Sequence, residues 1–343
     1  SQYALLFLII VIIFFTTSIL FNSLKQPLAV IFVNGWTDAP NAIATAVSTR
    51  AIKIRSAVIM AAIMNLAGAF ISTLTGAKVA TTILNMVDFD SAPQLPDKAP
   101  QIALAASLFA IVVWAVAAWY FGIPTSESHA LIAGLTGSAI SLGGMAAVHF
   151  DEWIKVIYGL LASVLIGFLG GLLITKLIAL IFQNVARRTA NKFFTIGQVF
   201  GAAANAYLHG AQDGQKFMGV FMLGLTLNGL ANPGATIPMW VIFTCAIVMG
   251  LGTSVGGEKI IKSVGMDMVK LEKYQGFAAD ISTAICIQLM TSLGVPVSTT
   301  HAKTTAIMGV AASRRMSSVD WGVVKEMVLA WVLTFPGCGL IAY

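Results

Sequence analysis

Long apolar runs, separated by short polar stretches, recur along the whole chain. A helix needs about 20 mainly apolar residues to cross the hydrocarbon of a bilayer. Runs that reach or approach this length occupy 3–21, 57–74, 102–121, 154–182, 237–251 and 323–340. They do not alternate polar and apolar residues, as the strands of a membrane β-barrel would. Together with the glycine-broken stretches between them, the runs predict an all-α polytopic membrane protein with roughly ten to twelve membrane segments.

Composition and charge agree with a membrane location. Of the 343 residues, 58% are apolar and 10% are charged, whereas about a quarter of the residues of a soluble domain are charged. The net charge is +6, and basic residues gather in short stretches between the runs. This pattern is typical of cytoplasmic loops and does not indicate nucleic-acid binding. The basic stretches contain Arg50, Lys53 and Arg55; Arg187, Arg188 and Lys192; and Arg314 and Arg315. The acidic stretch 88–98 is expected on the opposite side of the membrane.

Two further features bear on processing and covalent chemistry. The first run has no basic region before it and no small-residue cleavage site after it, so it is expected to be a retained helix. The three cysteines, Cys245, Cys286 and Cys338, lie far apart in apolar surroundings. They are expected to be packing residues, with neither a metal site nor a disulfide.

Two motifs occur twice in the same order. GWTDAPN at 35–41 is matched by GAQDGQK at 210–216, and GIPTSESHA at 122–130 is matched by GVPVSTTHA at 294–302. A weaker pair, 76–79 and 257–260, lies between them, and the offsets agree to within a few residues. Such duplication is a hallmark of secondary transporters. It predicts a first transmembrane repeat at 1–182, a basic cytoplasmic linker at 183–192 and a second repeat at 193–343. Inverted repeats with broken helices or re-entrant hairpins are the expected arrangement.

The second motif has the residue types that bind an oxyanion. Its Gly and Pro interrupt one helix in an apolar region and begin another. The first N–H groups of the new helix lack partners and lie at the positive end of the helix dipole, where an anion binds. Hydroxyl groups that follow the break are expected to contact the substrate; they belong to Thr125, Ser126, Ser128, Ser298, Thr299 and Thr300. The alternative is that these side chains only cap helices.

His129 and His301 end the two copies of the hydroxyl motif. They are expected to support the site by donating to the anion, relaying protons or fixing the turn.

Asp38 and Asp213 are expected to lie in glycine-containing breaks flanked by apolar helix, where a charge costs several kcal/mol unless it is paired or binds a cation. Asn41 follows Asp38 by three residues and shares its face if the segment is helical. These oxygen ligands suit Na⁺ or a shared proton. Asp280, in another apolar run, is either a further coupling residue or a structural carboxylate.

Lys216 replaces the amide in the second copy of the first motif. It is expected to pair with Asp213 or to face the anion, and the alternative is that it reaches the membrane surface. Gln215 beside it is included in the predicted substrate site.

With these motifs, essentially the whole chain resembles the inorganic phosphate transporters called PiT. That family carries G-x-[NH]-D-x-x-N and G-x-P-x-S-[ST]-[ST]-H in each half; the matching segments here are 35–41, 122–129, 209–216 and 294–301. The ending Gly214-Gln215-Lys216 is similar to the bacterial Pit branch, whose members import phosphate with protons, often as a metal–phosphate complex. The resemblance implies that Asp38, Asn41 and Asp213 coordinate the coupling cation or phosphate. It also implies that the hydroxyl clusters bind phosphate at mid-membrane.

Three residues depart from the family pattern. Thr37 and Gln212 stand where the family usually has Asn or His, and Glu127 interrupts the first hydroxyl cluster. Glu127 is expected at the rim of the cavity, since a carboxylate repels an oxyanion unless it is protonated or paired.

Transport, not catalysis, is therefore the expected activity. The leading hypothesis is proton-coupled import of inorganic phosphate through a bacterial-type cytoplasmic membrane, with H⁺ as the coupling ion, no other cofactor and no resident metal. Sodium-coupled phosphate symport, sulfate transport on the same scaffold and a passive anion channel are the alternatives. An intramembrane aspartyl protease is disfavoured, because neither Asp38 nor Asp213 lies in a G-x-G-D context. The sequence leaves open whether the chain forms a homodimer.

Overall fold

The computed structural model describes residues 19–89, 96, 98–255, 257–314 and 319–343. Within these ranges the regular structure is helical, apart from one isolated β-bridge between Val87 and Val148. The predicted all-α class is confirmed. The apolar run 3–21 lies almost entirely outside the described residues. The elements in chain order are α2 (Ile19–Thr37), η1 (Ala39–Ile43), α3 (Ala44–Ser48), α4 (Ile54–Thr75), α5 (Lys78–Leu84), α6 (Ala99–Phe121), α7 (Glu127–Gly143), η2 (Gly144–Ala147), α8 (Phe150–Ile181), α9 (Arg187–Leu227), α10 (Met239–Ser254), α11 (Glu258–Lys262), η3 (Ser263–Asp267), α12 (Lys273–Leu293), α13 (Thr299–Ala312) and α14 (Trp321–Ala342).

Six helices among the described residues are long and apolar enough to cross a membrane. They are α4, α6, α7 with its following turn, α8, α12 and α14, and the bent pair α10 and α11 makes a seventh if it is one span. This count is smaller than the ten to twelve segments expected. Part of the difference is α9, which has 41 residues but carries charged and amide side chains through its middle.

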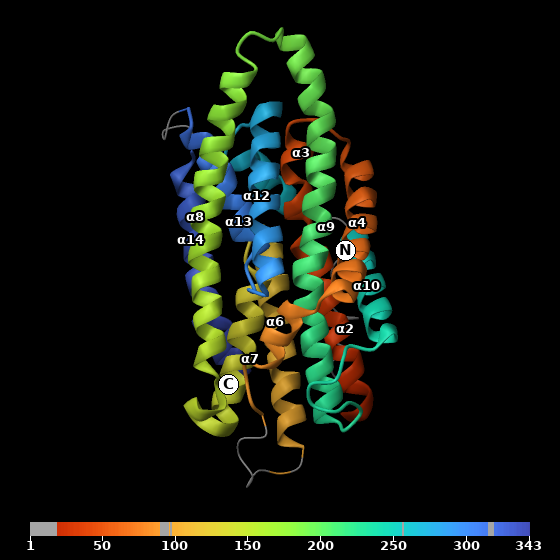
Figure 1. The fold of residues 1–343 in the computed structure, drawn as a ribbon. Coiled ribbons are helices and arrows are strands. Elements are labelled where there is room, and N and C mark those ends of the chain that lie inside the picture. The colour runs from red at the N-terminus through yellow and green to blue at the C-terminus, as the bar shows by residue number, and fades with distance from the viewer. Residues whose placement is uncertain (1–18, 90–95, 97, 256, 315–318) are drawn as a thin grey trace.

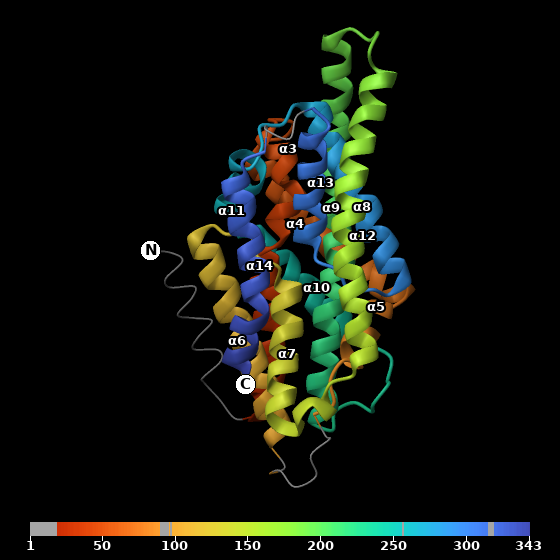
Figure 2. The ribbon, with the colours of Figure 1, turned by 90° about the vertical axis from the view of Figure 1, so that its left-hand side faces the viewer.

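The helices run roughly along one long axis (Figure 1). α8 and α9 project beyond the other helices at one end, where they are joined (Figures 1 and 2). The connection is shorter than the predicted linker 183–192, because α8 ends at Ile181 and α9 begins at Arg187. Residues 187–192 are therefore the first turns of α9. The segment after α3, which is also basic, lies toward the same end (Figure 1).

Two helix pairs form hairpins whose turns face each other. The first hairpin is α6 and α7 with the turn 122–126, and the second is α12 and α13 with the turn 294–298. The first hairpin occupies the lower half of Figure 1 and the second the upper half. Gly122 and Gly294 end α6 and α12 with φ of 71° and 73°, a left-handed conformation that favours glycine. The proline two residues later in each turn prevents the helix from continuing.

A lysine from outside each hairpin holds the helix that enters its turn. Lys78 Nζ, at the start of α5, donates to the carbonyl oxygen of Ser292 in α12 over 3.1 Å. Lys259 Nζ, in α11, donates to the carbonyl oxygen of Tyr120 in α6 over 2.9 Å. A cation at the C-terminal end of a helix satisfies a free carbonyl and the helix dipole. These two lysines belong to the weaker repeated pair 76–79 and 257–260, so the same contact is made twice.

Small residues bring α9 directly against α4, beside it in Figure 1. A Cβ on Gly68 would lie 1.8 Å from the carbonyl oxygen of Tyr207, and one on Gly210 would lie 2.0 Å from that of Asn65. Backbones that approach this closely are typical of helix packing in membranes. The contact places Asn65 of α4 beside His209 of α9.

Candidate functional site

Asp38 lies at a helix break, as predicted. α2 ends at Thr37, and the 3₁₀ segment η1 begins at Ala39 with Pro40 in its first turn. Proline lacks the N–H that would continue the α-helical pattern. One oxygen of Asp38, Oδ1, accepts hydrogen bonds from Asn41 Nδ2 at 2.7 Å and from Thr300 Oγ1 at 2.5 Å. Asn41 therefore does face Asp38, and a residue of the second hairpin joins them.

Asp213 does not lie at a break, so that prediction is wrong. It sits in the middle of the uninterrupted helix α9. Gly210 and Gly214, which suggested a break, instead allow α9 to pack closely on α4. Asp213 Oδ1 accepts from Lys216 at 2.6 Å, and Oδ2 accepts from Asn34 at 3.2 Å.

Lys216 joins α9 to both hairpins, at the first turn of α7 and at the turn 294–298. Its ammonium group is fully buried. It donates to Asp213 Oδ1 at 2.6 Å, to Ser128 Oγ at 2.6 Å and to the carbonyl oxygen of Val297 at 2.5 Å. All three of its donors are thereby used. The pairing with Asp213 is one of the two arrangements expected from the sequence, and the side chain does not reach the surface.

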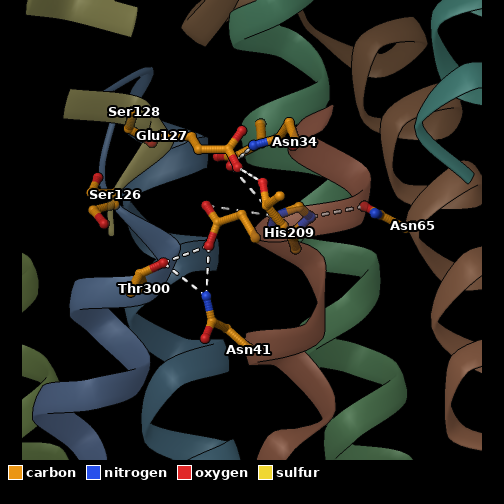
Figure 3. A network of polar contacts seen from close by, with 12 residues as sticks. Asn34, Asn41, Asn65, Ser126, Glu127, Ser128, His209 and Thr300 are labelled. Atoms are coloured by element: carbon orange, nitrogen blue, oxygen red, sulfur yellow. Dashed lines mark hydrogen bonds and ion pairs between the residues drawn. The ribbon is translucent and has the colours of Figure 1, made fainter. Parts of the chain in front are cut away.

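A histidine absent from the predicted site, His209, lies near both aspartates, and Figure 3 shows it with Asn65 on one side. His209 precedes Asp213 by one helical turn. Its Nε2 is 3.4 Å from Asp213 Oδ2 and 3.9 Å from Asp38 Oδ2. One ligand atom from each of the three side chains lies within 4.8 Å of the others, and all three residues are buried. The i, i+4 spacing to Asp213 was the available sequence signal, but the contact with Asp38 depends on the fold.

Glu127 is not at a cavity rim, because it is buried, with 2% of its surface exposed. It is the first residue of α7, where a carboxylate is favoured by the helix dipole. The hydroxyl group of Thr37 donates to Glu127 Oε1. Thr37 and Glu127, two of the three residues that depart from the family pattern, are thus hydrogen-bonded to each other. Glu127 is the third carboxylate near this network, after Asp38 and Asp213.

Apart from Thr125, the predicted hydroxyl residues divide into three groups. Ser126 and Ser298 cap α7 and α13, accepting from backbone N–H groups at 3.2 and 3.1 Å, as the capping alternative proposed. Ser128 and Thr300 join the buried network described above. Thr299 Oγ1 is buried without a hydrogen-bond partner.

The remaining predicted site residues lie outside this network. Thr125 is half-buried and lines an apolar pocket between α6 and α14. Gln215 accepts from the N–H of Val79 at 3.0 Å and donates to Ser72 at 2.7 Å, so it connects α9 to α5 and α4. The rings of His129 and His301 pack edge to face with centroids 4.4 Å apart, where the two turns meet.

Asp280 belongs to a second buried network. It pairs with Lys303 of α13 and accepts from Thr45 of α3 at 2.6 Å. Lys303 was missed from the sequence, because nothing in its local pattern showed that it would be 1% exposed. This pair joins the two helices of the second hairpin. The three cysteines are free and buried, as expected of packing residues.

Membrane-length helices around a buried network of acids, amides, a lysine and hydroxyls define a multi-pass membrane transport protein. A family model described as the phosphate transporter family matches residues 34–342. The chain belongs to the phosphate transporter family.

Individual relatives agree with this assignment. The chain is 43% identical to a probable low-affinity inorganic phosphate transporter of Bacillus subtilis, over 92% of this chain and 93% of the relative. It is 37% identical to a protein of the same description from Rhizobium meliloti, over 91% and 90%. Among solved structures, it matches a sodium-dependent phosphate transporter with a TM-score of 0.77 and 23% identity, over 95% of this chain and 97% of the other.

Proposed function

We propose that this protein imports inorganic phosphate across the cytoplasmic membrane by proton-coupled secondary transport. The observation that carries the proposal is the buried ammonium group of Lys216, which bridges Ser128 of the first hairpin and Val297 of the second. A fixed positive charge among hydroxyl groups and helix N-termini suits a phosphate oxyanion. The relatives named as inorganic phosphate transporters support the choice of substrate.

Phosphate is proposed to bind between the two hairpin turns. Ser128, Thr299 and Thr300 supply hydroxyl groups, and the first turns of α7 and α13 supply backbone N–H groups. On binding, the anion competes for the donors of Lys216 that now go to Ser128 and Val297. Ser298 and Ser126 hold the helix starts in place by capping them.

Alternating access is proposed to follow from two inverted repeats, 1–182 and 193–343. The opposed hairpins in the lower and upper halves of Figure 1 support this arrangement. Each would be re-entrant, with its turn at the membrane midplane, and each would close the path from one side. The basic α8–α9 connection would lie in the cytoplasm.

Proton coupling is assigned to Asp38, with Asn41 and Asp213 completing the site and Asp280 in support. Asp38 has only neutral hydrogen-bond donors, Asn41 and Thr300, so nothing in those contacts holds it ionised. Lys216 aligns with Asn41 of the first motif, and its ammonium group already forms an ion pair with Asp213.

Liposomes that contain the purified protein provide the test. Labelled phosphate should accumulate against its gradient when an inward proton gradient is imposed, with no sodium present. Accumulation that needs sodium and ignores the pH gradient would replace proton coupling by the second candidate, sodium symport, which the sodium-dependent structural neighbour favours. Equilibration without accumulation would indicate a channel. Competing sulfate that itself accumulates would indicate a sulfate carrier, and a strict requirement for Mg²⁺ would indicate transport of metal–phosphate.

A further inference from the structure

Two cavities adjoin beside the first hairpin, where α6 and α14 lie next to each other (Figure 2). The first, of about 380 Å³, lies between the end of α6, α11 and the start of α14. The second, of about 300 Å³, is lined by α6, α14 and the turn 122–126. Phe121, Ile123 and Glu326 line both cavities. The two therefore form one groove, which we call the α6–α14 groove.

The α6–α14 groove changes from polar to apolar along its two helices. On α14 the first cavity is lined by Val323, Glu326 and Met327, within the first two turns of the helix. The second cavity continues to Leu333, about 9 Å further along at 1.5 Å per residue. On α6 the last two residues line the first cavity, and the second reaches back to Trp114. α14 is long and apolar enough to cross a membrane. The polar part of the groove therefore lies near one membrane surface, and the apolar part lies at the depth of acyl chains.

Two lysines make the polar part of the groove positive. Lys259 and Lys262 line it together with Glu326, which gives two positive charges against one negative. Among the side chains that the structure describes, neither lysine is paired with a carboxylate. Lys259 Nζ donates one hydrogen bond to the carbonyl oxygen of Tyr120, so two of its donors remain. Ser263 adds a hydroxyl group. Basic cavities between membrane helices characteristically bind the head groups of anionic lipids.

The matching place on the second hairpin is filled by protein. α8 packs on that hairpin as α14 packs on the first. A Cβ on Gly159 of α8 would lie 2.5 Å from Val295, which aligns with Ile123 in the repeated motif. Helix and turn thus touch directly there, whereas Ile123 lines the groove. The groove is therefore not a consequence of the hairpin turn itself.

We propose that the α6–α14 groove binds a phospholipid with an anionic head group of the phosphatidylglycerol type. The lipid phosphate pairs with Lys259 and Lys262, the hydroxyl groups of the head group donate to Glu326, and an acyl chain lies in the apolar part. A lipid with one negative charge neutralises the excess positive charge of the polar part, which a zwitterionic lipid leaves unpaired. The end of α14 at which the lysines lie is directed toward the α8–α9 connection (Figure 2), and the cytoplasmic surface proposed for that connection is the one that carries anionic lipids.

The proposed lipid also contacts the turn of the first hairpin. Ile123 and Pro124 line the polar part of the groove, and Thr125 lines the apolar part. Trp331 of α14 holds the same turn, because its Nε1 donates to the carbonyl oxygen of Pro124 at 3.2 Å. A lipid wedged between α6 and α14 therefore stabilises this hairpin from the membrane side. It also gives a place to Thr125, the predicted hydroxyl residue that lies outside the buried network.

Native mass spectrometry of the full chain in detergent tests the proposal without phosphate uptake. Phosphatidylglycerol, phosphatidylethanolamine and phosphatidylcholine with the same acyl chains are added in equal amounts. One phosphatidylglycerol should be retained per chain, about fivefold more than either other lipid. Lys262→Gln should lower this retention about fivefold, the usual contribution of one lysine near an anionic lipid. The matched control is Lys325→Gln, because Lys325 is exposed and adjacent to Glu326 in the chain but does not line the groove; retention should not change.

Two further variants separate the head-group site from the acyl-chain site. Ala117 is exposed and lines the apolar part, so Ala117→Phe should fill the groove without disturbing the fold. It should lower the retention of all three lipids alike. Glu326→Gln keeps an acceptor for the head-group hydroxyls but removes a negative charge beside the phosphate, so it should strengthen phosphatidylglycerol binding.

Equal retention of the three lipids, or equal losses in Lys262→Gln and Lys325→Gln, would overturn the proposal. A preference for phosphatidylethanolamine that disappears in Glu326→Gln would overturn the anionic head group and indicate an ammonium group paired with Glu326. A dimer that Ala117→Phe dissociates, with no lipid retained, would assign the groove to a second copy of the chain. Each of these outcomes leaves the proposed phosphate transport unaffected, and loss of transport in the liposome test leaves the lipid site unaffected.

Discussion

The two copies of the first motif have different local structures, although each supplies one aspartate to the same site. At Asp38 the chain leaves α2 and enters η1, while at Asp213 the helix α9 continues. The motif alignment places Pro40 opposite Gln215, and only the proline removes a backbone donor. The partner also differs, since Asp38 accepts from the neutral Asn41 and Asp213 from the charged Lys216. The two copies of the motif therefore contain one aspartate with a fixed counter-charge and one without.

Lys216→Met should produce the largest effect. It removes the counter-charge of Asp213 and the donor of Ser128 and Val297. Breaking a buried ion pair from one side costs about 3–5 kcal/mol, so the thermal midpoint should fall strongly and phosphate uptake should drop to background. Thermal unfolding in detergent and uptake in liposomes measure the two effects. Adding Asp213→Asn should recover much of the stability but no transport; a double variant as unstable as the single would show that Lys216 stabilises through other contacts.

Substitution of the two aspartates should separate their roles. Asp38→Asn leaves the neutral partners Asn41 and Thr300 in place, so the protein should remain stable. Asp213→Asn leaves the buried ammonium of Lys216 without its anion, and should cost about 3 kcal/mol more than Asp38→Asn. Phosphate uptake by the Asp38 variant should fall at least tenfold and lose its response to a pH gradient. Equal stability losses in the two variants, measured by thermal unfolding, would contradict the distinction between a compensated and an uncompensated aspartate.

The sequence predicted local features well and tertiary pairings poorly. The break at Asp38 follows from Pro40, and the two hairpin turns follow from their Gly and Pro residues, because these act on their own backbone. Gly214 led to the wrong prediction of a helix break at Asp213. Glycine occurs both at helix breaks and where two helices pack closely, and only the contact with Ala69 of α4 shows that Gly214 serves close packing. His209 and Lys303 were missed because their partners, Asp38 and Asp280, are distant in sequence. Spacing along the chain does not reveal such contacts.

The hairpin turns are more alike than the aspartate motifs, and their capping serines should respond alike. Ser126→Ala and Ser298→Ala each remove one hydrogen bond to a helix N-terminus. Loss of a serine cap costs about 1 kcal/mol, so each variant should lose a few degrees of thermal midpoint. Uptake should fall several-fold, because the helix starts proposed to bind phosphate lose a capping hydrogen bond. If one variant were neutral in both assays, the two turns would not be functionally equivalent.

The smallest expected effect concerns the lysines that hold the hairpins. Lys78→Met and Lys259→Met each remove a partly solvent-exposed bond to the end of α12 or α6. A cation at a helix C-terminus contributes about 0.3–1 kcal/mol, so the thermal midpoint should hardly change. The rate of uptake should still change about twofold, because each lysine restrains the helix that leads into a turn at the site. Each variant should shift the rate in the same direction, since the two contacts are equivalent.

Lys155→Met is the matched control: Lys155 pairs with Glu152 on α8, far from either turn in the chain, and its loss should leave the rate unchanged. Opposite shifts in the two variants would mean that one hairpin moves during transport while the other stays fixed, and the similarity of the two turns would then be structural only.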